Sequence, residues 1–311
     1  MKKDLGNSSF RISLGLRVLA WIGFAWAKGL EPQAATWIEI LLMASVLILM
    51  PLARHLGHHH GPLNPSGAKT ELMAGLLLVP ALLSPIPAVL GAVGVGFWLI
   101  HQMRDATWIV WRWKTTPPPT AAYLCHRLAF VFPSIGAAWL LAHRLNWMPF
   151  GFDSLMVLLT AAHFHHAGFT LPLITGCCSN ASPSRLSKLA CLAVIAGVPL
   201  VATGITCTHF GVLPWMEPLG VSVLILGAFI VGGLQMRMAS APALSWMTRS
   251  LFVLSGLSLL VAMLLALGYG LRSYLPQWAL PMPAMWAIHG TLNGFGFGLC
   301  GILAWRRRFG F

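Results

Sequence analysis

The sequence predicts an all-α protein, a polytopic bundle of about ten transmembrane helices, and three observations carry this prediction. Apolar residues make up 57% of the 311 residues and charged residues only 9%, whereas a soluble domain has about 25% charged residues. The chain contains 31 Gly, 21 Pro and 14 Trp, a composition typical of membrane helices and their interfaces with water. Apolar runs follow one another along most of the chain. We therefore expect a single integral membrane domain over residues 1–311.

Ten apolar runs of suitable length are separated by charges, prolines or glycines. A helix that crosses a bilayer needs about 20 mostly apolar residues. The predicted spans are 12–28, 34–53, 68–84, 87–103, 121–142, 154–175, 188–207, 212–234, 250–270 and 282–304. The third and fourth are separated only by a short segment with Pro85 and Pro87, which a continuous helix does not tolerate.

Basic residues predict the orientation of these spans. If Arg306, Arg307 and Arg308 lie in the cytoplasm, 15 of the 20 basic residues fall in cytoplasmic loops and only 3 in outer loops. Because cytoplasmic loops carry an excess of Lys and Arg, both termini are expected in the cytoplasm. The basic residues are scattered rather than gathered on one element, so we expect the lipid bilayer as partner and no nucleic acid.

The first run has some features of a signal peptide. Lys2 and Lys3 precede it, and it ends in an A-x-A pattern at residues 25–27, which cleavage sites share. Arg17 interrupts the apolar stretch, so we expect an uncleaved first anchor.

Three histidines in the sixth predicted span are the strongest candidates for a functional site. Ionisable side chains within a bilayer cost roughly a few kcal/mol each, which makes those inside the spans functional candidates. At about 100° per residue in an α-helix, Thr160, His163 and His166 share one face, whereas His165 points to another.

The last predicted span supplies a second pair of polar side chains. His289 and Asn293 are four residues apart and therefore lie on one helix face. Because polar side chains avoid lipid, we expect the sixth and tenth spans to meet and to bring this pair to His163 or His165 in one buried site. The alternative is that His289 and Asn293 bond only to each other or to backbone carbonyls between helices.

Small residues in the last span predict close helix packing. Gly290, Gly294 and Gly298 form a stripe with a spacing of four, which lets a neighbouring backbone approach. We expect this stripe to be the contact surface of the last span.

Glu39 lies a few residues into the second predicted span and is a further candidate for the substrate or ion site. Its alternative role is to extend to the membrane surface without a function.

A metal or haem site is a further hypothesis. Imidazole-rich and carboxylate-poor sites suit zinc, copper, iron or haem, and His163, His165, His166 and His289 are the candidate ligands. The HFHH spacing does not match the HxxxH and HxxHH boxes of membrane desaturases. The sequence therefore establishes no cofactor.

The histidine motif of the sixth predicted span and the His289/Asn293 motif of the last span resemble motifs of the YndJ-like family of bacterial membrane proteins. The resemblance lies in Gly136 to Ala142, Pro149 to Phe152, and Leu159 to His165 followed by Ala167 to Phe169, and in Met285, Trp286, His289, Gly290, Asn293, Gly296 and Phe297. It covers about residues 30–305, with HFHxAGF its most specific part. The family motif has an aromatic residue at the position of His166, so the resemblance points to His163, His165, His289 and Asn293. It implies a multi-pass protein of the bacterial cytoplasmic (inner) membrane and supplies no reaction.

Three hypotheses about function follow. The first is a protein that binds or moves a small solute or ion through a buried His/Asn site, with coupling to protons as one form of it. Against it, the two halves of the chain show no repeat of the kind found in many transporters. The second is a membrane enzyme that uses a His-bound metal or haem on a lipid-soluble substrate, and the third is an accessory membrane protein without a substrate.

Overall fold

The structure is a computed structural model that describes residues 2–59, 67–83, 87–113 and 120–310. All regular structure in these residues is helical. The elements are α1 (Lys2–Lys28), α2 (Thr36–Ala44), η1 (Ser45–Leu49), α3 (Met50–His59), α4 (Gly67–Leu82), α5 (Ala88–Trp113), α6 (Ala121–Arg144), η2 (Pro149–Gly151), α7 (Ser154–His166), α8 (Thr170–Ala181), α9 (Arg185–His209), α10 (Met216–Ala239), α11 (Trp246–Gly270), η3 (Pro276–Trp278), α12 (Met282–Ala284), η4 (Met285–Gly290), η5 (Leu292–Leu299) and α13 (Cys300–Arg308).

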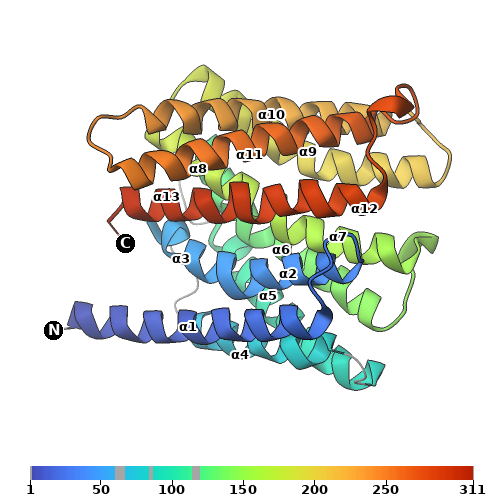
Figure 1. The fold of residues 1–311 in the computed structure, drawn as a ribbon, viewed down its shortest axis with the longest axis horizontal. Helices are drawn as coiled ribbons and strands as arrows, with labels where there is room; N and C mark the ends of the chain where they lie inside the picture. The colour runs from blue at the N-terminus through green and yellow to red at the C-terminus, as the bar shows by residue number, and fades with distance from the viewer. Residues whose placement is uncertain (1, 60–66, 84–86, 114–119, 311) are drawn as a thin grey trace.

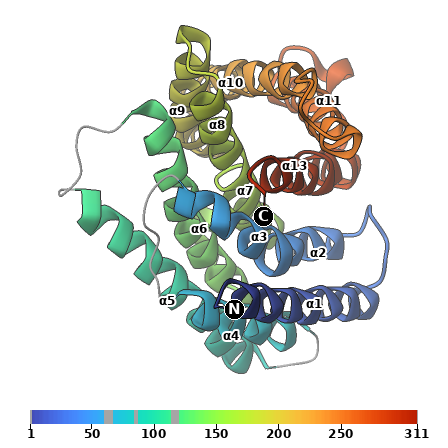
Figure 2. The same cartoon turned by 90° about the vertical axis from the view of Figure 1, so that its left-hand side faces the viewer.

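The long helices run roughly side by side, as Figure 1 shows. Helix α1 begins and α13 ends at the same end of the bundle, which we call the terminal end; the opposite end is the distal end. Viewed end-on, α9, α10, α11 and α13 lie in one part of the bundle and α1, α4 and α5 in another, with α2, α6 and α7 between them (Figure 2). Segments far apart in sequence, such as α2 and the last span, are therefore neighbours in space.

Polar residues mark the beginnings of several helices. The side chain of Asp153 accepts a hydrogen bond from the backbone N–H of Met156 at the start of α7, and Thr120 caps α6 through Tyr123 in the same way. Such caps satisfy backbone N–H groups that have no partner within the helix. These polar residues thus define where α6 and α7 begin.

Eight helical stretches in the described part of the chain are long and apolar enough to cross a membrane. They correspond to eight of the predicted spans, and the exceptions are α4 and α5. Helix α4 has only 16 residues, and α5 carries His101, Gln102, Arg104 and Asp105 within its length. The predicted ranges 68–84 and 87–103 are helical over their described residues, and that they cross the membrane stays a prediction.

Three of the spans are not regular α-helices. The second contains the π-helical segment η1. The sixth breaks into α7 and α8 at residues 167–169, directly after the three histidines. The last span is π-helical from Met285 to Gly290 and from Leu292 to Leu299. Wide π-turns are rare and occur often at functional sites. The irregularities of the sixth and last spans coincide with the motifs that carry the candidate site residues.

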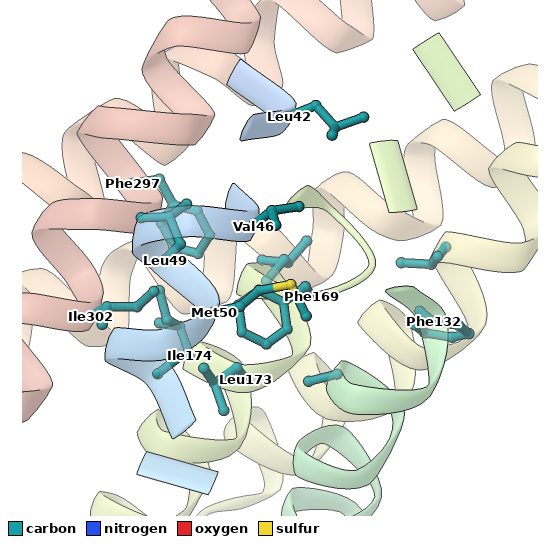
Figure 3. Packing of buried hydrophobic residues seen from close by; sticks show 14 of the residues in the cluster. Leu42, Val46, Leu49, Met50, Phe132, Phe169, Leu173, Ile174, Phe297 and Ile302 are labelled. Atoms are coloured by element: carbon teal, nitrogen blue, oxygen red, sulfur yellow. The ribbon is translucent and has the colours of Figure 1, made fainter. Parts of the chain in front are cut away.

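A continuous apolar core runs through the bundle. Figure 3 shows side chains from several helices meeting there: Leu49, Met50, Phe169, Leu173, Ile174, Phe297 and Ile302. Phe297 is 1% exposed and also lines the cavity described below. It therefore separates that cavity from the packed core.

The closest helix packing lies between α9 and α10. A Cβ on Gly220 would stand 2.7 Å from the backbone carbonyl carbon of Leu200, and one on Gly204 would stand 2.5 Å from Cα of Glu217. By contrast, a Cβ on Gly294 would meet only side-chain atoms of His166 and Leu41, at 3.4 Å. Gly290 and Gly298 face the side chains of Leu41 and Leu49 in the same way. The stripe therefore lies against α2 and η1 as expected, but at Gly294 it meets side chains and not a backbone.

A buried ionic cluster joins α3, α4 and α5. Nε of Arg54 lies 2.6 Å from Oε2 of Glu71, and Nη2 of the same arginine lies 3.1 Å from Oδ2 of Asp105. Glu71 is 3% and Asp105 8% exposed. Arg17 of α1 is also buried, and its Nε and Nη1 have no hydrogen-bond partner. Charges in so little water need their partners, so this cluster fixes α4 and α5 against the rest of the protein.

Within the described part of the chain, the amide of a buried glutamine in α10 has no partner. Gln235 is 0% exposed, and both Nε2 and Oε1 lack a hydrogen bond. A buried polar group without a partner costs about 1–3 kcal/mol. We therefore expect Gln235→Leu to raise the unfolding midpoint of the purified protein, by an amount equivalent to at least about 1 kcal/mol.

The matched control is Ser255→Ala. Ser255 is as buried as Gln235, but its hydroxyl donates to the carbonyl of Phe297 at 2.9 Å. This variant should lower the midpoint in the same thermal scan. A decrease in the Gln235→Leu variant would mean that water or another group satisfies the amide.

Candidate functional site

A cavity of about 240 Å³ lies in the distal half of the bundle. Its walls come from α2, α7, α8, α9, α10, α11 and the first half of the last span. Most lining residues are apolar. Most of the polar ones form two groups, an inner group of Thr160, His163, His166, His289 and Asn293 and an outer group of Glu217, Tyr269 and Arg272. Thr170 also lines the cavity, and its hydroxyl donates to the carbonyl of His166. The expected meeting of the sixth and tenth spans around one cavity is therefore found.

The break between α7 and α8 positions the histidines. Backbone groups that the break releases find new partners: Oγ of Ser45 donates to the carbonyl of His165 at 2.6 Å, and Oγ1 of Thr170 donates to that of His166 at 2.8 Å. The N–H of Gly168 donates to the carbonyl of His163. Since lipid offers no partner for a backbone group, these bonds let the chain end a helix inside the bundle.

His163 projects into the cavity. It lies within a membrane-spanning stretch. Its side chain is nevertheless exposed, because it borders the cavity. Among the described residues its ring nitrogens have no hydrogen-bond partner. A neutral imidazole offers one donor and one acceptor, so both are available to a bound molecule.

His166 shares the cavity wall with His163, as the helix-face argument predicts. Its Nε2–H donates to the carbonyl of Leu41 at 3.0 Å, which leaves Nδ1 as an acceptor. That Nδ1 is buried and has no partner.

His165 points away from the cavity and is fully paired. Nε1–H of Trp98 donates to its Nε2 at 3.0 Å, and its Nδ1–H donates to the carbonyl of Ala161 at 2.8 Å. Gly136 makes room for the ring, because a Cβ there would lie 2.6 Å from Nδ1. The expectation that His165 belongs to the same site as His163 is therefore wrong, since the turn of the helix directs it toward α5 and α6.

His289 and Asn293 form one unit on the opposite wall. Nδ1–H of His289 donates to the carbonyl of Ala262 at 2.8 Å, so its Nε2 is an acceptor. Nδ2 of Asn293 donates to that Nε2 at 3.1 Å and to the carbonyl of His289 at 2.9 Å. His289 and Asn293 therefore bond to each other and to backbone carbonyls, as the alternative predicts. The two residues also line the cavity.

An ion pair lies on the outer part of the cavity wall. The guanidinium of Arg272 donates to both carboxylate oxygens of Glu217, at 2.5 and 3.1 Å, and stacks over the ring of Tyr269 at 4.3 Å. Burial alone would lower the pKa of Arg272, but the bonds to Glu217 raise it above its ordinary value. Sequence reasoning missed this pair, although a carboxylate inside the predicted range 212–234 was the available signal.

Glu39 lies apart from the cavity. Its Oε2 is 2.7 Å from Nζ of Lys28, and it is absent from the cavity lining, whereas its neighbours Ile38 and Leu41 take part. Its observed role is an ion pair between the end of α1 and the start of α2.

The four histidines proposed as metal or haem ligands do not come together. His165 lies on the other side of α7, and His289 uses Nδ1 and Nε2 for Ala262 and Asn293. Within the described residues, no three His, Cys, Asp or Glu side chains gather in a way that could hold a metal ion. The described side chains therefore do not form a metal site with three or more of these ligands.

Comparison with known proteins agrees with the motifs. Residues 40–297 match the family described as YndJ-like protein. The chain is 22% identical over 303 residues to the uncharacterized membrane protein YndJ of Bacillus subtilis (strain 168), which covers 93% of this chain and 51% of the relative. The chain thus spans about half of the length of this curated relative. No solved structure matches it. The chain is a multi-pass helical membrane protein that belongs to the YndJ-like family.

Proposed function

We propose that the protein binds a small, largely apolar solute in the distal cavity, as the binding step of its transport across the membrane. One observation carries the proposal: residues more than 100 positions apart in sequence, His163 and His289 with Asn293, line a single cavity. Ligand pockets typically combine apolar walls with a few polar groups. The volume of about 240 Å³ restricts the ligand to a small molecule.

The polar groups of the cavity support a binding role over a packing defect. Cavities that stay empty are apolar, whereas this one is lined by His163, whose ring has no partner among the described residues. Nδ1 of His166 is buried in the same wall, and no described residue bonds to it. Leaving such groups without a partner is costly. A bound molecule or water that enters from outside would supply the missing hydrogen bonds.

We also propose a placement in the bacterial cytoplasmic membrane. The chain would form one domain with ten spans and cytoplasmic termini, so that the distal cavity lies in the outer half of the bilayer. The charge bias of the loops and the common end of α1 and α13 support this orientation (Figure 1). Coupling to protons would use His163, whose ring has no competing partner among the described residues.

The test uses a membrane-impermeant thiol reagent, 2-(trimethylammonium)ethyl methanethiosulfonate, on a single cysteine at Thr160. The background carries Cys207→Ser and Cys300→Ala, because these two cysteines are partly exposed while the other four are buried. In proteoliposomes we expect Thr160→Cys to react from one side of the membrane only. Adding Ala162→Phe, which fills the cavity, should slow the reaction at least about tenfold.

Ser255→Cys is the matched control, because Ser255 is fully buried in the core. It should not react from either side. If Thr160→Cys were as unreactive as this control, water-soluble molecules would not reach the cavity and the proposed binding step would be wrong.

A further inference from the structure

We infer that the cavity selects a solute whose head group donates hydrogen bonds, a protonated amine or a hydroxyl, attached to an apolar body. This inference rests on the proposed binding function and concerns its substrate class. It follows from which polar atoms of the inner group are already used within the protein and which remain free.

Asn293 presents an acceptor to the cavity. Its amide nitrogen is identified by its bond to the carbonyl of His289 at 2.9 Å, since a carbonyl only accepts. The oxygen of the same amide therefore lies on the other side, where no described residue bonds to it. His289 has no free ring nitrogen, because Nδ1 is bonded to Ala262 and Nε2 to Asn293.

Thr160 also presents an acceptor, whereas the free acceptor of His166 is buried in the cavity wall. The carbonyl of Leu41 fixes the proton of His166 on Nε2, so the free Nδ1 carries a lone pair. The hydroxyl of Thr160 donates to the carbonyl of Met156 at 2.8 Å, which leaves only its oxygen lone pairs for a ligand. The accessible atoms of the inner group thus combine three acceptors, the amide oxygen of Asn293, the hydroxyl oxygen of Thr160 and one ring nitrogen of His163, with a single free donor, the other ring nitrogen of His163.

The remaining walls fit an apolar body. Leu41, Met285 and Trp286 line the same space as the inner group, and aromatic faces such as that of Trp286 also attract cations. A ligand that carries only acceptors would leave the amide oxygen of Asn293 and the hydroxyl oxygen of Thr160 without a donor, and a site built to bond a donor discriminates against molecules that lack one.

Three probes with the same aromatic body test this inference: phenethylamine, 2-phenylethanol and their acceptor-only counterpart, benzyl methyl ether. Binding is measured by calorimetry on the whole protein in nanodiscs, with empty nanodiscs subtracted. We expect the amine or the alcohol to bind about tenfold more tightly than the ether, as one additional hydrogen bond provides. Tighter binding of the amine indicates a cationic solute, and tighter binding of the alcohol indicates a neutral one.

Two variants test which residues cause the preference for a probe that donates a hydrogen bond. Thr160→Val removes the hydroxyl acceptor with little change in shape, and Asn293→Leu removes the amide oxygen. Each should reduce the ratio of affinities at least about threefold, while Glu31→Ala, at an exposed site outside the cavity, should leave it unchanged. Thr160→Val keeps the test valid if Asn293→Leu fails to fold.

The binding measurements can contradict the inferred donor chemistry and the proposed binding function separately. Equal affinity for all three probes, or a preference that persists in both variants, would overturn the inferred donor chemistry and leave the binding function standing. If none of the three probes bound, the proposed binding function itself would fail.

Discussion

Glu71→Ala is expected to destabilise the protein more than any other single substitution discussed here. The carboxylate is 3% exposed and lies 2.6 Å from Nε of Arg54, and its removal leaves Arg17 and Arg54 with Asp105 as the remaining carboxylate of the cluster. Breaking a buried ion pair by removing one partner costs about 3–5 kcal/mol. Heating the detergent-purified protein and measuring the monodisperse fraction by size-exclusion chromatography should show a midpoint many degrees lower, together with a reduced yield.

Two further variants separate charge from shape at this position. Glu71→Gln preserves the volume and removes the charge, so it should fall between the wild type and Glu71→Ala. Glu31→Ala removes an exposed carboxylate and should remain within about 0.5 kcal/mol of the wild type. If Glu71→Ala were no less stable than Glu31→Ala, the cluster would not hold α4 and α5 in place.

The second large effect is expected from Gly220→Ala in α10. The added Cβ would stand 2.7 Å from the carbonyl carbon of Leu200 and 2.8 Å from the backbone nitrogen of Val201. Because these atoms belong to the backbone of α9, the two helices must separate along their whole contact. Overpacking of this kind costs about 1–3 kcal/mol, and the same heating assay should show a lower midpoint.

Gly233→Ala is the matched control within the same helix. A Cβ at Gly233 would meet no atom within 4 Å, so the substitution should be neutral or should stabilise the helix by up to about 1 kcal/mol. Equal effects of Gly220→Ala and Gly233→Ala would show that loss of glycine, rather than the α9–α10 contact, determines stability.

The sequence predicts the helical class and eight of the spans well, because apolar runs bounded by caps and prolines are local signals. It does not predict the break after His166 or the π-turns of the last span. Both depend on distant partners, as the bond from Ser45 to the carbonyl of His165 shows. Length and hydropathy do not establish α4 and α5 as spans either, because α4 is short and α5 contains several polar residues. Packing against other helices positions them.

Helical periodicity predicts a good part of the candidate site. It places Thr160, His163 and His166 on one face, and the structure puts all three on the cavity wall. It could not assign Trp98 as the partner of His165, because that contact depends on how α5 packs against α7. Glu217 and Arg272 were missed for a similar reason: their pairing joins the start of α10 to the loop after α11.

The π-turns of the last span have a consequence for how insertions and deletions act on this protein. A π-turn holds one residue more than the α-helical turn it replaces, so the stretch Leu292–Leu299 contains spare chain. Deleting one residue there would convert a wide turn into an ordinary one and keep both ends of the span in place. The same deletion in the regular helix α11 would rotate everything beyond it by about 100°. Length variation among relatives is therefore expected to concentrate in this part of the last span, between the His289 unit and the basic end of α13.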